Sequence, residues 1–254
     1  MHTVKPVVKR VRSSARLGLA ARLAAAVALG LLLAGCAPDS ITAEGARIHS
    51  LYNLFLWTAA VVFGLVTSLV LWSVLRYRRR DDQLPKQIEG HNGLELAWTI
   101  VPFLLVIFLF VMTIRTQNKV LSDPPGAVTI DVTAFQWSWQ FDYEDSGRQV
   151  VGGPGRIPEL LVPAGVPVHI KLRSADVVHA FYVPRTLFKR QAIPGTVNEF
   201  DLRFTQTGIY PGECTQFCGV AHSDMLFTVH VVSQASFQQF LSTGRAGSSG
   251  SSGT

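Results

Sequence analysis

The sequence predicts a chain of mixed class, membrane α plus all-β, in which a two-helix transmembrane hairpin precedes an extracytoplasmic β-sandwich or barrel. Two uncharged apolar runs, residues 54–75 and 96–114, contain 22 and 19 residues. Each run is long enough to cross a hydrocarbon core of about 30 Å. Between residues 120 and 241, short segments rich in Val, Ile, Leu and Phe are separated by Pro and Gly, a pattern typical of strands joined by turns.

Composition and charge agree with this class. Only 16% of the 254 residues are charged, against roughly 25% in a typical soluble domain, which argues against a soluble cytosolic enzyme. The net charge of +6 arises in the first 35 residues, whereas residues 121–243 hold 8 basic and 11 acidic side chains. The basic balance therefore gives no support for nucleic-acid binding, and no Lys/Arg-rich patch with interleaved aromatic residues supports it either.

The N-terminal segment 1–35 has the form of a secretory signal. A basic start is followed by an apolar stretch over residues 23–33 and then by Ala34-Gly35-Cys36. The run 33–36 resembles the lipobox of bacterial lipoproteins, in which the cysteine becomes the lipidated first residue, so Cys36 is a candidate lipidation site. The alternative is an uncleaved anchor helix with an incidental cysteine.

Charge also predicts the topology of the hairpin, residues 51–117. Its loop 76–94 carries four arginines and a lysine, so the positive-inside rule assigns the loop to the cytoplasm. The segment 36–50 and the β domain, residues 118–241, are then expected outside. The Gly/Ser-rich tail 242–254 is expected to be disordered.

Six segments of the C-terminal half predict strands, and one predicts a short helix. The expected strands cover residues 128–132, 159–162, 166–172, 177–183, 199–204 and 226–232, and the helix covers 235–241. Several short strands at this spacing indicate a sandwich or a barrel.

The loop 214–225 holds the residues best suited to metal chemistry. Cys214, Cys218, His222 and Met225 form a soft donor set, which suits copper, whereas methionine is a poor zinc ligand. A disulfide between Cys214 and Cys218 is the structural alternative outside the cytoplasm, but it leaves the histidine and the methionine unexplained.

The number of cysteines bears on the kind of copper site. A mononuclear blue-copper site uses one Cys, two His and a weak Met, which leaves one thiolate over. Two thiolates can instead bridge two coppers, each completed by one histidine. The second histidine has three candidates, His169, His179 and His230. His169 and His230 lie within alternating strand segments, where a packed or solvated histidine is more common.

Four blocks of the sequence resemble subunit II of cytochrome c oxidase. They are Leu94-Glu95-Leu96-Ala97-Trp98-Thr99-Ile100-Val101-Pro102, Phe135-Gln136-Trp137-Ser138-Trp139, Asp176-Val177-Val178-His179 with Ala192-Ile193-Pro194-Gly195, and the loop Cys214–Met225. The resemblance implies a cupredoxin-like β domain after the hairpin. It also implies a multi-pass protein of the bacterial cell membrane, with the β domain outside the cytoplasm.

The resemblance implies a dinuclear copper centre, called CuA. Cys214 and Cys218 would bridge both ions. His179 and Met225 would complete one copper, and His222 and the backbone carbonyl of Gln216 the other. Electrons would come from cytochrome c and pass to the haems of oxidase subunit I. There oxygen is reduced to water and protons are pumped.

Further roles follow from the resemblance alone. Trp137 is the residue at which electrons would enter, and Asp142 and Asp176 match acidic groups that dock the cytochrome. Glu95 resembles the acid at the mouth of a proton path, although an acid there also complements a helix N-terminus. Gln216 stands where the family usually has a glutamate that reaches magnesium, so magnesium is not favoured.

Three other classes of protein with a related domain can be compared with this sequence. A copper-free subunit II of a quinol oxidase would not need the intact ligand set. Nitrous oxide reductase carries a similar copper domain, but two membrane spans and the lack of a His-rich catalytic domain exclude it. A membrane-tethered mononuclear cupredoxin stays an alternative.

Overall fold

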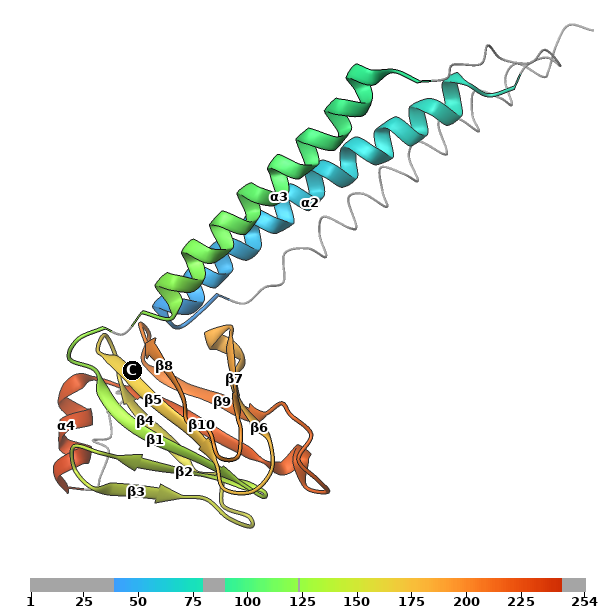
Figure 1. The fold of residues 1–254 in the computed structure, drawn as a ribbon. Coiled ribbons are helices and arrows are strands. Elements are labelled where there is room, and N and C mark those ends of the chain that lie inside the picture. Colours follow the sequence, from blue (N-terminus) through green and yellow to red (C-terminus); the bar gives the residue numbers. More distant parts are fainter. Residues whose placement is uncertain (1–38, 80–89, 123, 244–254) are drawn as a thin grey trace, which may run out of the picture. The chain divides into compact units, whose positions relative to one another are not determined.

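The computed structural model describes residues 39–79, 90–122 and 124–243 (Figure 1). The signal segment 1–35, the candidate lipidation site Cys36, the loop residues 80–89 and the tail residues 244–254 lie outside the described residues.

Two long helices form the hairpin, α2 (Ala43–Arg76) and α3 (Asn92–Val120), and they pack against each other (Figure 1). Both predicted apolar runs lie inside them, but α2 begins within the segment 36–50 that was expected to precede the hairpin. Arg47 Nη1 donates a hydrogen bond to the Lys119 carbonyl at 2.7 Å, which joins the start of α2 to the end of α3.

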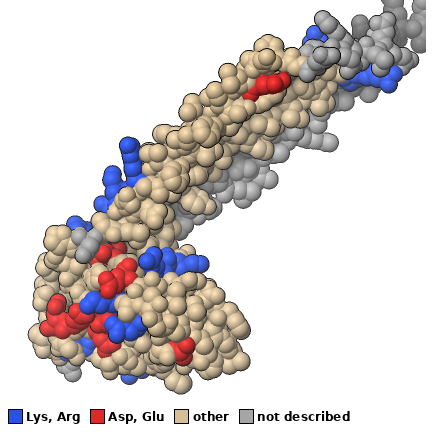
Figure 2. All heavy atoms as spheres, in the orientation of Figure 1, with Lys and Arg blue, Asp and Glu red and all other residues tan. Residues whose placement is uncertain are grey.

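The helices have the surface of membrane spans. Their most apolar windows have mean hydropathies of 2.3 and 2.5, and no residue of either window is buried within the protein. Charged side chains gather at the helix ends and on the β domain, with an almost uncharged stretch between (Figure 2). Such a surface needs lipid around it. Pro102 lies inside α3, and membrane helices tolerate this because neighbouring groups satisfy the freed backbone.

The β domain is a sandwich of two five-stranded sheets, with strand orders β3-β2-β1-β5-β8 and β4-β10-β9-β6-β7. The strands are β1 (Val128–Phe135), β2 (Ser138–Tyr143), β3 (Arg148–Val151), β4 (Glu159–Pro163), β5 (Pro167–Ser174), β6 (His179–Val183), β7 (Phe188–Ala192), β8 (Asn198–Arg203), β9 (Gly208–Cys214) and β10 (Leu226–Val232). Strands β1 and β5 pair in parallel, as do β4 and β10, and the other pairs are antiparallel. The fold class predicted from the sequence is thus confirmed.

The core lies between the sheets and is rich in aromatic side chains. Trp139, Phe141, Phe181 and Phe227 are all at most 1% exposed, and the rings of Phe181 and Phe227 stack with centroids 4.7 Å apart. Burying such rings supplies much of the hydrophobic stabilisation of a small domain. The helix α4 (Gln234–Thr243) packs against β4, and its buried side chains extend this core.

A short segment ahead of α2 is fastened to the β domain. Ile41 is fully buried, and its backbone N–H donates to the Arg185 carbonyl at 2.9 Å. Its carbonyl accepts from Thr205 N at 2.8 Å, and the Glu44 carboxylate accepts from Arg203 N at 2.8 Å. The side chain of Thr42 caps α2 by accepting from Gly45 N.

Candidate metal centre

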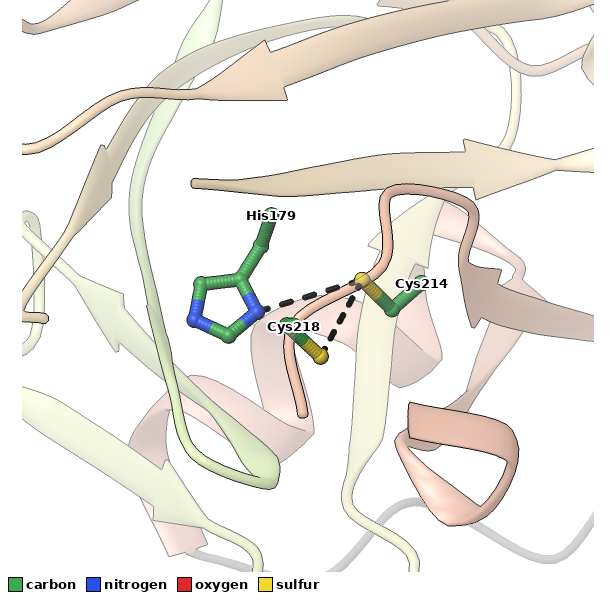
Figure 3. Close-up of side chains that lie close together, drawn as sticks. All are labelled: His179, Cys214 and Cys218. Atoms are coloured by element: carbon green, nitrogen blue, oxygen red, sulfur yellow. Dashed lines mark hydrogen bonds between the residues drawn. The ribbon is translucent and has the colours of Figure 1, made fainter. Parts of the chain in front are cut away.

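Two paired strands and the loop that follows them bring three donor atoms together. His179 begins β6 and Cys214 ends β9, and these strands are neighbours in one sheet. His179 Nδ1 lies 3.9 Å from Cys214 Sγ, which lies 4.0 Å from Cys218 Sγ (Figure 3). The three atoms lie within 4.8 Å of one another. Two thiolates bound to one ion at about 2.3 Å are at most about 4.6 Å apart, so the sulfur spacing suits shared metal ions.

The loop from β9 to β10 adds three more donors. Cys218 Sγ lies 3.4 Å from His222 Nδ1 and 3.7 Å from Met225 Sδ. Cys214 Sγ lies 3.2 Å from the carbonyl oxygen of Gln216. Every copper ligand named by the resemblance therefore has its donor atom within 4 Å of a cysteine sulfur.

The two cysteines are not bonded to each other. Their sulfurs are 4.0 Å apart, about twice the S–S bond length of roughly 2.0 Å, and both thiols are free. The disulfide considered from the sequence is absent from this structure.

Most of the donors are buried, and their side chains are chemically soft, whereas His222 and Gln216 are partly exposed. His179 and Met225 are fully buried, and Cys218 and Cys214 are only 3% and 6% exposed. Thiolate, thioether and imidazole groups select copper over magnesium or calcium, which prefer oxygen. The residues therefore fit copper.

The thiols influence each other in the metal-free chain. Burial acts to raise the pKa of Cys214, but hydrogen bonds from His179 and the backbone outweigh it and lower this pKa to about 7. Burial and the neighbouring Cys214 raise the pKa of Cys218 to about 12. Because the ligands bind metal as thiolates, metal uptake must expel the remaining proton.

The turn between β1 and β2 lies against the loop 214–225, which carries the candidate copper ligands and is named the copper loop. Trp137 Nε1 donates to the Cys218 carbonyl at 3.2 Å, and the residue is 37% exposed. Beside it is a surface groove of about 390 Å³ lined by Trp137, Ser138, Gly153, Gly155, Arg156, Ile157, Asp224 and Leu226. One aromatic ring thus contacts both the copper loop and the surface.

Comparisons with known proteins give the family. The model of the cytochrome c oxidase subunit II periplasmic domain matches residues 157–232, and that of its transmembrane domain matches residues 31–115. Cytochrome c oxidase subunit 2 of Mycobacterium tuberculosis is 31% identical over 307 residues, covering 91% of this chain and 82% of that protein. The probable cytochrome c oxidase subunit 2 of Streptomyces avermitilis is 34% identical over 275 residues, covering 87% and 86%. This chain belongs to the cytochrome c oxidase subunit II family.

A solved structure of the periplasmic domain of subunit II from Bradyrhizobium japonicum is 31% identical to this chain. It covers 47% of this chain and 94% of its own, with a TM-score of 0.43. Membership makes the chain a membrane-bound subunit of an oxidoreductase complex, with a periplasmic domain and with other haem-copper oxidase subunits as partners.

The other two candidate histidines lie away from this cluster. His169 Nδ1 pairs with Asp201 at 3.1 Å, and His230 Nδ1 pairs with Glu159 at 2.5 Å. Both are engaged with carboxylates on strand faces, as the alternating sequence pattern indicated. Of these three candidate histidines, His179 is the one that lies beside the sulfur donors.

The two acids expected to dock a cytochrome already have partners within the chain. Asp142 accepts from Gln140 Nε2 at 2.7 Å and from Gln149 Nε2 at 2.6 Å. Asp176 Oδ1 lies 2.8 Å from His179 Nε2, and its other oxygen accepts from Gln136 N at 2.7 Å. Asp176 thus contacts the candidate ligand His179 and also places a negative charge at the surface.

Glu95 and Gln216 have local partners too. Glu95 Oε1 accepts at 3.4 Å from the backbone N–H of His91, the N-cap residue of α3, as expected for an acid at a helix start. Gln191 Nε2 donates to Gln216 Oε1 at 3.4 Å. The pair is neutral, so it offers a magnesium ion no carboxylate.

Sequence reasoning missed two residues of the site. Gln136 Nε2 donates to the Cys218 carbonyl at 2.8 Å, and Trp139 Nε1 donates to the Met225 carbonyl at 3.5 Å. Both belong to the aromatic block that pointed to the family, but nothing in the local pattern shows contacts with a loop about 80 residues away.

Proposed function

We propose that this subunit accepts electrons from cytochrome c at a dinuclear CuA centre and passes them to the haems of oxidase subunit I. The observation that carries the proposal is the convergence of His179, His222 and Met225 on two unbonded, buried cysteine sulfurs. A mononuclear site would leave one of these thiols without a ligand role.

The proposed ligands divide between two ions. Cys214 and Cys218 would hold both coppers, His179 and Met225 would complete the ligands of one, and His222 with the Gln216 carbonyl would complete those of the other. When bound, the two copper ions would supply a site that takes up one electron and shares its charge between both metals. Four of these ligands, His179, Cys214, Cys218 and Met225, are buried and would limit the access of water, so that little would have to rearrange when an electron moves.

Electrons would enter at Trp137, which joins the surface to the Cys218 carbonyl through its indole N–H. The β domain is net negative, and this charge would attract a basic cytochrome, with Asp142 and Asp176 contributing. Oxygen reduction and the coupled proton pumping would take place in subunit I, with Glu95 at the mouth of a proton path. The proposal includes no magnesium ion near Gln216 and Gln191, because both side chains are neutral and magnesium prefers carboxylate oxygens.

The proposed location is the bacterial cell membrane, spanned by both helices. The loop 76–94 would lie in the cytoplasm and the β domain outside. The signal segment would be removed and Cys36 lipidated, so the intact mass of the purified subunit should lack residues 1–35. A mass that still includes them would contradict this processing.

The experiment is a metal analysis of the full-length chain purified with its partner subunits. Two coppers per chain and a seven-line hyperfine pattern in spin resonance are expected, since one unpaired electron is shared by two copper nuclei. One copper with a four-line pattern would indicate a mononuclear site, and no copper would indicate a quinol-oxidase type of subunit. Cys218→Ser should abolish the shared-electron signal, while Ser223→Ala in the same loop should keep it.

A further inference from the structure

We propose that Gln136 is a positioning residue that holds the Cys218 carbonyl against Trp137 and thereby fixes the geometry between the electron-accepting surface and the copper loop. The proposal rests on the proposed function for its consequence in electron transfer, but its structural content can be tested without copper.

Gln136 has contacts with two sides of the metal centre. Its side-chain Nε2 donates to the Cys218 carbonyl at 2.8 Å, and its backbone N–H donates to Asp176 Oδ2 at 2.7 Å. Asp176 in turn holds His179. Gln136 thus connects Asp176, the hydrogen-bond partner of the proposed ligand His179, with the backbone of the proposed ligand Cys218.

The Cys218 carbonyl receives two donors from one turn. Gln136 Nε2 lies 2.8 Å from this oxygen and Trp137 Nε1 lies 3.2 Å from it. The hydrogen bond from Gln136 is the shorter of the two, and it fixes the orientation of the Cys218 carbonyl. The partly exposed indole ring of Trp137 must align with that carbonyl to donate its own hydrogen bond. Without the hydrogen bond from Gln136, the oxygen would be held within this turn by the indole N–H alone.

The packing around this oxygen is close enough to need a glycine next to it. Gly219 has φ +126°, and a Cβ built there would lie 3.1 Å from Trp137 Nε1 and 3.2 Å from Gln136 Nε2. The turn can approach the copper loop this closely because residue 219 has no side chain.

The contact matters because Cys218 is itself a ligand. Its Sγ lies 3.4 Å from His222 Nδ1 and 3.7 Å from Met225 Sδ. A rotation of the residue 218 backbone moves this sulfur relative to both partners. It also moves the carbonyl oxygen through which the Trp137 indole reaches the residue.

The test compares Gln136→Leu with Gln140→Leu in the full-length chain with its partner subunits. Leucine has a similar size and no donor. Gln140 is a suitable control because it follows the same turn but donates to Asp142, away from the copper loop. In the copper-free protein, amide hydrogen exchange over residues 215–221 should be about fivefold faster in Gln136→Leu, as expected for the loss of one net hydrogen bond. The control should match the unaltered protein.

The copper-loaded protein gives the second readout. Gln136→Leu should keep its copper content but alter the hyperfine splitting, and electron transfer from cytochrome c should slow with the KM for cytochrome c unchanged. Unchanged exchange and splitting in Gln136→Leu would overturn the proposal, as would equal changes in Gln140→Leu. If the unaltered protein shows no dinuclear signal, the proposed function fails, while the exchange comparison still decides whether Gln136 positions the loop.

Discussion

Asp176 Oδ1 lies 2.8 Å from His179 Nε2, the ring nitrogen opposite the one that faces Cys214. This contact places the proton of a neutral imidazole on Nε2 and leaves the Nδ1 lone pair for a metal. Partial burial acts to raise the pKa of Asp176, but hydrogen bonds from His179, Gln136 and Val177 outweigh it and hold this pKa below its ordinary value. The carboxylate therefore stays charged at neutral pH.

The first prediction is that Asp176→Ala lowers copper affinity by about 10- to 100-fold, the usual effect of losing an outer partner of a metal-bound histidine. Asp176→Asn should lose less, because the amide oxygen can still accept from Nε2. Competition titration against a copper chelator measures the affinity. Asp142→Asn is the control, since Asp142 contacts only Gln140 and Gln149 among the hydrogen bonds described. Equal affinities in Asp176→Ala and the control would rule the positioning role out.

The second prediction assigns steering to Asp142. Asp142→Asn should slow association with cytochrome c at low ionic strength and flatten its salt dependence, because a surface charge acts on encounter and salt screens it. The rate of electron transfer within the bound complex should not change. Stopped-flow reduction at several salt concentrations separates the two steps. Glu159→Gln, on the other sheet, serves as a charge-matched comparison, and an identical salt slope in both variants would argue against a local docking role.

The third prediction concerns Trp137. Trp137→Phe removes the indole N–H that contacts the Cys218 carbonyl but no ligand, so copper content and fold should stay nearly unchanged. Electron transfer from bound cytochrome c should fall sharply, because tunnelling depends exponentially on coupling through the ring. Ile157→Ala is the control, because it alters the same groove but leaves the hydrogen bonds to the Cys218 carbonyl in place, and it should keep the transfer rate unchanged. An unchanged transfer rate in fully metallated Trp137→Phe would mean that electrons enter elsewhere.

The helices and six strands could be predicted from the sequence because the helices are long apolar runs and the strands are short segments rich in Val, Ile, Leu and Phe. Three of the four strands it missed, β3, β7 and β9, lack that signal for different physical reasons. β7 is a polar edge strand, and β3 is a short edge strand. β9 contains Pro211 and two glycines, which disfavour a strand, yet it lies between β10 and β6 and is formed by pairing with both. β2 does carry the strand pattern, since Trp139, Phe141 and Tyr143 alternate inward, but its first residues also belong to the aromatic block that resembles the family.

The copper loop could be predicted because its candidate ligands are local in the sequence. Cys214, Cys218, His222 and Met225 are close in sequence, so their spacing alone indicates a shared site. The choice of His179 over His169 and His230 came from the family resemblance, because it depends on which strands pair. The contacts of Asp176 and Gln136 are tertiary, so neither could be obtained from local sequence patterns.

The fourth prediction tests what joins the two sheets. The Tyr143 hydroxyl donates to the Leu161 carbonyl at 3.0 Å and accepts from Leu161 N at 2.8 Å, and Tyr143 is 1% exposed. Tyr143→Phe should lower the free energy of unfolding of the β domain by about 2 kcal/mol, since two buried backbone groups lose their partner. Chemical denaturation followed by aromatic circular dichroism measures this. Tyr210→Phe, whose hydroxyl makes only longer bonds of 3.3 and 3.4 Å, should cost much less.

The last prediction separates the two roles considered for Glu95. Glu95→Gln keeps an oxygen that can accept from His91 N, so the start of α3 should be preserved. It removes the ability to exchange a proton at neutral pH. If Glu95 lies at the mouth of a proton path, oxygen consumption and proton uptake by the assembled oxidase should fall, while copper content and the first electron transfer from cytochrome c stay normal. His91→Ala gives the opposite pattern, because it removes the side chain that caps Leu94 N and leaves the carboxylate in place. Full turnover in Glu95→Gln would reduce Glu95 to a residue of the helix start.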